Sequence, residues 1–237
     1  MKLWAIGDLH LSFSEEGNLR KPMGIFGKNW EYHDQKIKEN WIENVSAEDM
    51  VMIPGDFSWA MNLEELKVDI EYLKNLPGKK ILIRGNHDYW WTSIKKMTSF
   101  FPEGINFIQN DHFQVNDHLY ICGTRGWSVP GEKGFSKEDE KIYLRELSRL
   151  KLSLNSVPKE PGREIIVMLH YPPVNMKHDY SGFIELFEEY NVKMCIYGHL
   201  HDASIGCRMP DSKWGIEFRL VSADALDFTP LFIKETP

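Results

Sequence analysis

The apolar residues of this chain gather into short runs that each stop at a glycine or a polar residue. Runs of this length, rich in aliphatic and β-branched residues, are typical of strands buried on both faces of a sheet. We expect such strands at Leu3 to Ile6, Met50 to Ile53, Lys80 to Ile83, Ile165 to Leu169 and Met194 to Tyr197.

Helical spacing separates several of these runs. A helix is expected after Asn62, where one apolar stripe continues up to a Pro-Gly pair: Leu63, Leu66, Ile70 and Leu73. Ser136 and Asp139 resemble a capping box at the start of a long helix, whose stripe is Tyr143, Leu147, Leu150 and Leu154. A third helix is expected from Asp34 to Asn44.

The order of these elements predicts a mixed α/β fold. Strands that alternate with helices in the first half indicate parallel βαβ units. Phe113 to Val115 and Leu119 to Cys122 read as a hairpin, and the tail from Ile205 offers further short strands without a helix. No linker or repeat divides the chain, so we expect one domain over residues 1–237, with a long loop at 11–33 near the first candidate site residues.

Composition restricts the class of protein. A net charge of -7 and a pI near 5.7 disfavour a long nucleic-acid footprint. The three cysteines are far apart, which favours free thiols in a reducing compartment over a disulfide framework. The first apolar run is too short for a signal peptide, and no run reaches the length of a membrane helix. We therefore expect a cytoplasmic protein without a membrane segment; the oligomeric state is left open.

Metal-ligand side chains follow every predicted buried strand. Because loops at the carboxyl ends of strands converge on one crevice, these residues are expected to lie together. Asp-x-His and His-x-His spacings on extended backbone also point both side chains the same way. Each piece alone has an ordinary explanation as a helix cap, turn or core residue, but the set recurs after all five runs: Asp8 and His10, Asp56, Asn86 to Asp88, His170, and His199 with His201.

In this order and spacing, the motifs Asp-x-His, Gly-Asp, Gly-Asn-His-Asp, His and Gly-His-x-His resemble the calcineurin-like metallophosphoesterase family over residues 8–201. The resemblance implies two mixed β-sheets packed face to face with helices outside, a four-layer αββα sandwich. It also implies a binuclear phosphohydrolase that cleaves a small phosphomonoester or phosphodiester by attack of a metal-bridging hydroxide.

The resemblance also implies which residues bind two transition-metal ions, manganese, iron or zinc. One ion would be held by Asp8, His10, Asp56 and His201, and the second by Asp56, Asn86, His170 and His199. Imidazole nitrogens suit these metals, while carboxylates offset their charge and can bridge two ions. His87 would stand at the leaving-group oxygen as a general acid or a charge-stabilising donor.

One branch of the family is disfavoured. Its protein phosphatases carry an Asp and an Arg shortly after Gly-Asp, whereas here Asp56 is followed by Phe57, Ser58, Trp59 and Ala60. Asp88 is our candidate for orienting His87. Arg84 and Arg125 are candidates for binding phosphate, because a guanidinium matches phosphate oxygens, although both could equally be structural.

Aromatic residues cluster beside the motifs: Trp59, Tyr89, Trp90, Trp91, Trp127 and Tyr171. They could stack a nucleobase or another flat group, and core packing is the simpler explanation for most of them. Two alternatives to a small-molecule phosphoesterase stay open: a catalytically silent scaffold of the same fold that binds a protein, and a nuclease, which the acidic charge disfavours.

Overall fold

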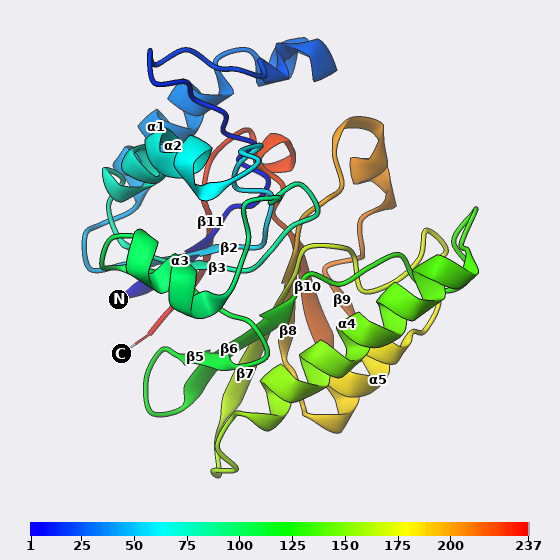
Figure 1. Cartoon of the computed structure of the whole chain (residues 1–237). Helices are drawn as coiled ribbons and strands as arrows, with labels where there is room; N and C mark the ends of the chain where they lie inside the picture. The colour runs from blue at the N-terminus through cyan, green and yellow to red at the C-terminus, as the bar shows by residue number, and fades with distance from the viewer. Residues whose placement is uncertain (237) are drawn as a thin grey trace. The chain divides into compact units, whose positions relative to one another are not determined.

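The computed structural model describes residues 1–236 and divides them into two compact units (Figure 1). Unit 1 consists of Met1–Phe107 together with the segment that begins at Val221, and unit 2 is Ile108–Leu220. The chain therefore leaves unit 1 once, builds unit 2, and returns. Whether residues 1–237 act as a single domain stays a prediction.

Unit 1 is built on a five-stranded mixed sheet of order β11-β1-β2-β3-β4. Strands β1 to β4 run parallel, and β11 pairs antiparallel with β1. The strands are β1 (Lys2–Ala5), β2 (Met50–Ile53), β3 (Lys79–Leu82), β4 (Ile105–Phe107) and β11 (Leu231–Glu235). The helices are α1 (His33–Asn44), α2 (Leu63–Lys74) and α3 (Ile94–Phe100), with 3-10 turns at Met23–Phe26, Lys28–Trp30 and Ala223–Leu226.

Unit 2 is built on a six-stranded mixed sheet of order β5-β6-β7-β8-β10-β9. The hairpin expected around Asn116 is present, because β5 pairs antiparallel with β6. The strands are β5 (His112–Gln114), β6 (Leu119–Thr124), β7 (Glu164–Leu169), β8 (Met194–Tyr197), β9 (Ser212–Lys213) and β10 (Ile216–Leu220). Helices α4 (Lys137–Asn155) and α5 (Gly182–Glu189) lie side by side along this sheet (Figure 1), and a 3-10 turn covers Asp202–Cys207.

The sequence patterns explain why these elements form. Asn62 caps α2 by accepting a hydrogen bond from Glu65 N at 3.0 Å. Ser136 and Asp139 form the expected reciprocal capping box of α4. Such caps stabilise a helix by about 1 kcal/mol each. Two mixed sheets with flanking helices confirm the predicted α/β class, and no helix within residues 1–236 is long and apolar enough to cross a membrane.

Alternate strand residues of each sheet pack on its own helices. In unit 1, Ile37 and Trp41 of α1 and Leu66 of α2 lie in one cluster with Val51 and Leu82 of the strands. Their neighbours along the strands are also buried, as expected for central parallel strands covered on both faces. This packing fixes the strand ends, and the loops that leave those ends carry the candidate site residues.

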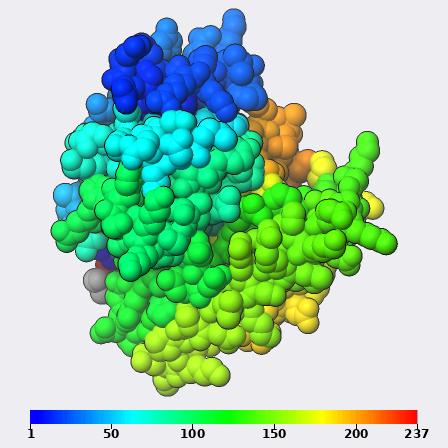
Figure 2. All heavy atoms as spheres, in the orientation of Figure 1, coloured from blue at the N-terminus to red at the C-terminus, as the bar shows by residue number. Residues whose placement is uncertain are grey.

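The predicted loop at 11–33 is long and mostly irregular, and it lies on α2. Phe13 N donates to the buried Asp69 carboxylate at 2.8 Å, and Arg20 pairs with Glu65 at 3.5 Å. Figure 2 shows the blue atoms of this loop lying over the cyan atoms near α2. These contacts hold the loop against the helix beside the residues that follow β1.

Candidate metal centre

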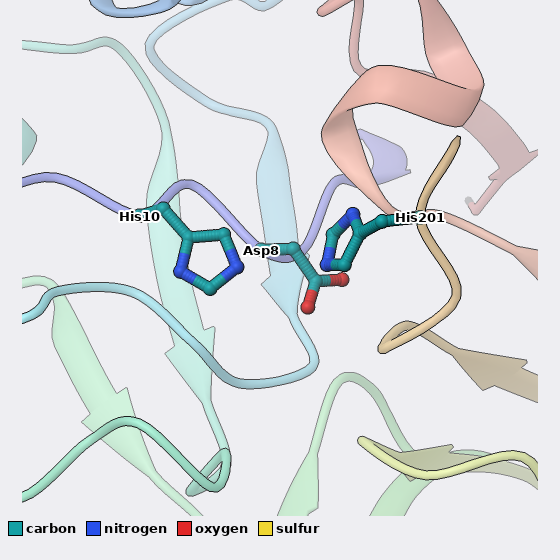
Figure 3. A group of neighbouring side chains, drawn as sticks. All are labelled: Asp8, His10 and His201. Atoms are coloured by element: carbon teal, nitrogen blue, oxygen red, sulfur yellow. The ribbon is translucent and has the colours of Figure 1, made fainter. Parts of the chain in front are cut away.

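Two neighbouring strands of unit 1 deliver Asp8, His10 and Asp56. All three side chains are buried, with exposed fractions of 0%, 3% and 1%. The loop after β1 is tied to the loop after β2, because Asp8 N donates to Gly55 O and His10 N donates to Asp56 O, each at 3.0 Å. Figure 3 shows Asp8 and His10 side by side on the first of these loops.

The backbone at these residues is strained. Asp8, His10 and Asp56 adopt the left-handed region with φ of 55°, 46° and 51°, and His199 of unit 2 does so at 71°. A residue with a β-carbon held there costs of order 1–3 kcal/mol, and such residues concentrate at functional sites. Four of the residues expected to bind metal therefore have backbone conformations that are sterically disfavoured.

The side chains of this cluster suit a cation. Carboxylate oxygens of Asp8 and Asp56 lie within 4.8 Å of each other, and a ring nitrogen of His10 lies equally close to Asp8. His10 Nε2 is 3.8 Å from Asp56 Oδ2. Two buried carboxylates this close repel one another unless a cation or a proton compensates their charge. Oxygen and nitrogen donors of these kinds can bind divalent metal ions.

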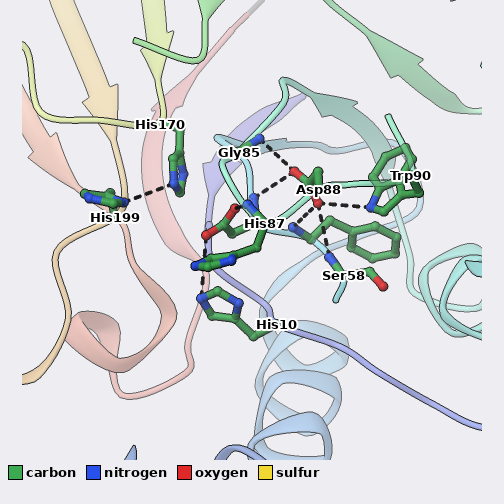
Figure 4. Close-up of polar contacts among 10 residues, drawn as sticks. His10, Ser58, Gly85, His87, Asp88, Trp90, His170 and His199 are labelled. Atoms are coloured by element: carbon green, nitrogen blue, oxygen red, sulfur yellow. Dashed lines mark hydrogen bonds and ion pairs between the residues drawn. The ribbon is translucent and has the colours of Figure 1, made fainter. Parts of the chain in front are cut away.

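The loop from Gly85 to Asp88 holds Asp56 in place (Figure 4). His87 N donates to Asp56 Oδ1 at 2.8 Å, which leaves Oδ2 toward His10. Gly85 is required there, because a β-carbon at that position would lie 2.1 Å from Asp56 Oδ1. Asn86, the fourth predicted ligand of unit 1, is half-buried in the same loop.

Asp88 anchors the two loops to each other (Figure 4). Its buried carboxylate accepts hydrogen bonds from the backbone N–H groups of Gly85, Asp56, Phe57 and Ser58, at 2.7, 2.9, 3.0 and 3.3 Å. It also accepts one from Trp90 Nε1 at 3.1 Å. Through these bonds Asp88 fixes the backbone of the loop that carries His87, and an orienting role toward the His87 ring stays a prediction.

Aromatic rings surround the histidines of unit 1. Trp59 stacks on His10 with centroids 5.0 Å apart and lies 4.1 Å from the His87 ring. Trp30 meets His10 edge-on at 5.9 Å and His33 at 5.6 Å. The motifs gave no signal for Trp30, because it lies in the 11–33 loop, distant in sequence from every ligand pair.

Three of the histidines in unit 2 are candidate metal ligands. His170 follows β7 and is fully buried, and His199 follows β8. His199 Nδ1 lies 3.2 Å from His170 Nε2, as the dashed line in Figure 4 marks. Two imidazoles that share an ion at about 2.1 Å place their nitrogens roughly 3.0–3.4 Å apart, so this pair fits one metal. His201 lies at the start of the 3-10 turn at Asp202–Cys207 (Figure 3).

The two candidate phosphate-binding arginines differ in their surroundings. Arg125 is 3.6 Å from the buried Glu146 carboxylate and lies 4.5 Å from the Trp127 ring centroid. Its carbonyl accepts hydrogen bonds from His170 N and Tyr171 N at 3.0 and 2.9 Å. These contacts give Arg125 a structural role in holding the segment of His170. Arg84 is half-buried beside Gly85, and its Nε has no hydrogen-bond partner within residues 1–236.

The other four histidines of the sequence lie outside the motifs, and one of them is wholly buried. His33 packs against Trp30 and Phe228, and burial lowers its pKa. His178 Nε2 contacts Cys207 O at 2.9 Å, and His112 Nδ1 contacts Ser156 Oγ at 2.8 Å. His118 is exposed.

The chain is similar in sequence to two proteins, over different shares of its length. It is 25% identical to a probable cyclic nucleotide phosphodiesterase of Coxiella burnetii, over 85% of this chain and 76% of the relative. It is also 36% identical to the Gene 66 protein of Mycobacterium phage D29, over 36% of this chain and 40% of that protein.

Solved structures share the fold at low sequence identity. The phosphopantetheinyl hydrolase of Mycobacterium tuberculosis is 14% identical with a TM-score of 0.55, covering 100% of this chain and 96% of that one. A protein of unknown function from Aquifex aeolicus is 18% identical with a TM-score of 0.50, covering 98% and 95%.

The sequence model of the calcineurin-like phosphoesterases matches residues 1–203, a stretch that contains every candidate ligand described above. This family supports phosphoester hydrolysis with divalent metal ions as the general chemistry of the chain. With the expected motifs in their expected order at the strand ends, this chain belongs to the calcineurin-like phosphoesterase family.

Proposed function

We propose that the protein hydrolyses a small phosphoester at a centre of two metal ions. The observation that carries this proposal is the donor set: buried, strained Asp8 and Asp56 in unit 1, and an imidazole pair 3.2 Å apart in unit 2. Buried carboxylates this close need a cation or a proton to compensate their charge, and two ring nitrogens 3.2 Å apart are spaced either for one hydrogen bond or for one shared ion.

The proposed ligand sets are those implied by the family. Asp8, His10, Asp56 and His201 would hold one ion, and Asp56, Asn86, His170 and His199 would hold the other. Manganese, iron and zinc all suit this mixture of imidazole, carboxylate and amide donors. When bound, two such ions lower the pKa of a shared water and neutralise charge on the phosphoryl oxygens.

The remaining residues act around that centre. Asp56 is proposed as the bridging carboxylate, and the bond from His87 N to its Oδ1 supports this by restricting its rotation. His87 is proposed to donate a proton to the leaving oxygen from its ring, whose centroid lies 4.1 Å from that of the tilted Trp59 ring. Asp88 is proposed as a positioning residue, and Arg84 is favoured over Arg125 for phosphate because Arg125 already contacts Glu146.

The substrate is proposed to be a phosphodiester, with a monoester as the second candidate. The similarity to a probable cyclic nucleotide phosphodiesterase supports the diester. A silent scaffold would gain nothing from strained ligand residues, whose cost persists only where function or surrounding structure demands it. The net charge of -7 argues against a nuclease.

The test is reconstitution of metal-free protein with manganese, iron or zinc, followed by elemental analysis and assays on phosphomonoesters, cyclic nucleotides and dinucleotides. We expect close to two ions per chain and turnover that appears only with metal. Binding of a single ion at saturation would contradict the binuclear centre. Two bound ions without turnover on any of these esters would favour the scaffold.

A further inference from the structure

We propose that a cavity in unit 2 binds a flat heteroaromatic ring, of the nucleobase class, on the organic arm of the phosphoester. This inference rests on the proposed function, because it assigns the part of the substrate that the metal ligands do not contact. The cavity has a volume of about 240 Å³ and is lined mainly by Trp127, Tyr171, Val174, Met176, His199 and Leu200.

The cavity begins at a proposed metal ligand. The Tyr171 ring lies on the His199 ring, with centroids 3.9 Å apart. The Nδ1 atom of that same His199 ring is 3.2 Å from His170 Nε2. A phosphoryl group held at these two histidines would therefore have the wall formed by Tyr171 and Trp127 within reach of its ester arm.

The chemistry of the lining selects a neutral, flat group. Ring faces and a methionine thioether suit stacked aromatic ligands. The described lining residues include one carboxylate, Glu132, and no lysine or arginine, so the cavity does not suit a second phosphate. Glu132 Oε2 accepts a hydrogen bond from Met176 N at 3.0 Å, and a carboxylate can accept several more, for instance from the N–H groups of a base.

The ring wall is fixed before any ligand arrives. Trp127 Nε1 donates to Asp139 Oδ1 at 2.9 Å, and the Arg125 guanidinium lies 4.5 Å from the centre of its ring. Tyr171 is held by the bond from its N–H to Arg125 O. A wall held in place loses little side-chain entropy when a ligand binds, which favours affinity.

The other aromatic residues beside the motifs are occupied differently. Trp90 is buried in the core of unit 1 with Trp91 packed against it, and Trp59 covers His10 and His87. Tyr89 is exposed near His87. Of the six aromatics that the sequence brings close to the motifs, the cavity takes Trp127 and Tyr171. They are the pair to change in an experiment.

The experiment measures kcat/KM of the metal-loaded protein on two matched pairs of esters. The monoester pair is adenosine 5′-phosphate and ribose 5-phosphate, and the diester pair is their methyl esters. Stacking contributes roughly 1–3 kcal/mol per base, so the adenosine ester should be preferred about 5- to 150-fold. Trp127→Leu should lower kcat/KM for the adenosine ester much more than for the ribose ester, and so remove most of this preference. Trp214→Leu is the control, because Trp214 packs in unit 2 outside the cavity.

Met176→Ala provides a second variant that preserves the fold, because Met176 is 63% exposed. It should lower kcat/KM for the adenosine ester by roughly 2- to 10-fold, in line with partial loss of apolar contact. Calorimetry of adenosine binding to the metal-loaded protein gives a readout without catalysis. We expect binding in the wild type and in Trp214→Leu, and weaker binding in Trp127→Leu.

The outcomes separate this inference from the proposed function. Equal kcat/KM on ring-bearing and ring-free esters, or equal effects of the Trp127 and Trp214 substitutions, would overturn the ring site while phosphoester hydrolysis stands. Failure to hydrolyse any of the four esters would count against the proposed function. In that case adenosine binding decides alone: a loss specific to Trp127→Leu supports the cavity, and absence of binding in the wild type overturns it.

Discussion

The two units differ in the candidate ligands they carry and in how each unit holds them. Unit 1 offers the two carboxylates, Asp8 and Asp56, from left-handed backbone in loops that are hydrogen-bonded together. Unit 2 offers three imidazoles, and of these His199 is the one in a left-handed conformation. The carboxylate charge that could compensate a metal ion thus lies in unit 1, in strained and tightly bonded loops that also carry His10. The other three candidate imidazole donors lie in unit 2, in the segments that follow β7 and β8.

The difference between the units is tested most directly by removing a carboxylate charge from unit 1 and an imidazole nitrogen from unit 2. Asp56→Asn keeps the shape of the side chain but removes the charge of the proposed bridging carboxylate. Activity should therefore fall to the uncatalysed background, and both ions should be lost. His170→Gln removes one nitrogen and should leave the ion of the other ligand set bound. Elemental analysis and turnover measure both effects. An Asp56→Asn protein with two ions and near-normal turnover would eliminate the bridging role.

His87 tests whether unit 1 supplies chemistry in addition to charge. His87→Ala should retain both ions and lose roughly 10²- to 10⁴-fold in kcat on an alkyl ester, the range of general acid catalysis. A nitrophenyl ester should lose less, because its leaving group needs little protonation. Equal losses on the two esters would argue for a positioning or stabilising role, and no loss would remove His87 from the mechanism.

The rigidity of the unit 1 loops depends on Asp88. Asp88→Ala should lower the free energy of unfolding by about 3–5 kcal/mol, because it leaves several buried N–H donors without an acceptor. Asp117→Ala is the matched control, since Asp117 is exposed and should change stability by less than about 0.5 kcal/mol. Denaturant unfolding compares the two variants. A loss as small as that of the control would mean that the loops hold together without Asp88.

The contact between the 11–33 loop and α2 should depend on pH through Asp69. Burial raises the pKa of Asp69 to about 6, above its ordinary value of 3.8. The folded state therefore binds this proton more tightly than the unfolded state. This contribution to stability is fully present below about pH 4 and is lost as pH rises through 6, by up to about 3 kcal/mol. Asp69→Asn should flatten stability between pH 4 and 7, and an unchanged slope would contradict the assignment.

Local patterns were enough to predict the five strands that precede the motifs and the helices α1, α2 and α4, whereas β4 was missed. The runs at Met50–Ile53 and Met194–Tyr197 match β2 and β8, and the Ser136 capping box begins α4 as expected. The closing strand β11 pairs with β1 from the opposite end of the chain, and α3 and α5 were not predicted. Such pairings depend on packing between distant segments, and short helices carry little periodicity.

The candidate site shows the same division between local and distant information. The candidate ligands all lie shortly after buried strands, so local motifs were sufficient to propose them, and their binding of metal stays a prediction. Three contacts join segments far apart in sequence: the hydrogen bonds of Asp88 to the loop after β2, the ion pair of Arg125 with Glu146, and the edge-on contact of Trp30 with His10. No spacing rule within one segment contains that information.

Because the Asp88 carboxylate anchors the loop that carries Asp56, transfer of this site to another protein depends on both loops. The close approach of Gly85 to Asp56 and the bonds from residues 56–58 to Asp88 make the two segments geometrically interdependent. A chimera in which a related protein receives the Gly55–Ser58 segment alone would carry the candidate ligand Asp56 without the loop that holds it in place. The two loops form one structural unit. An exchange of loops between homologous proteins should preserve function only when both segments are transferred together.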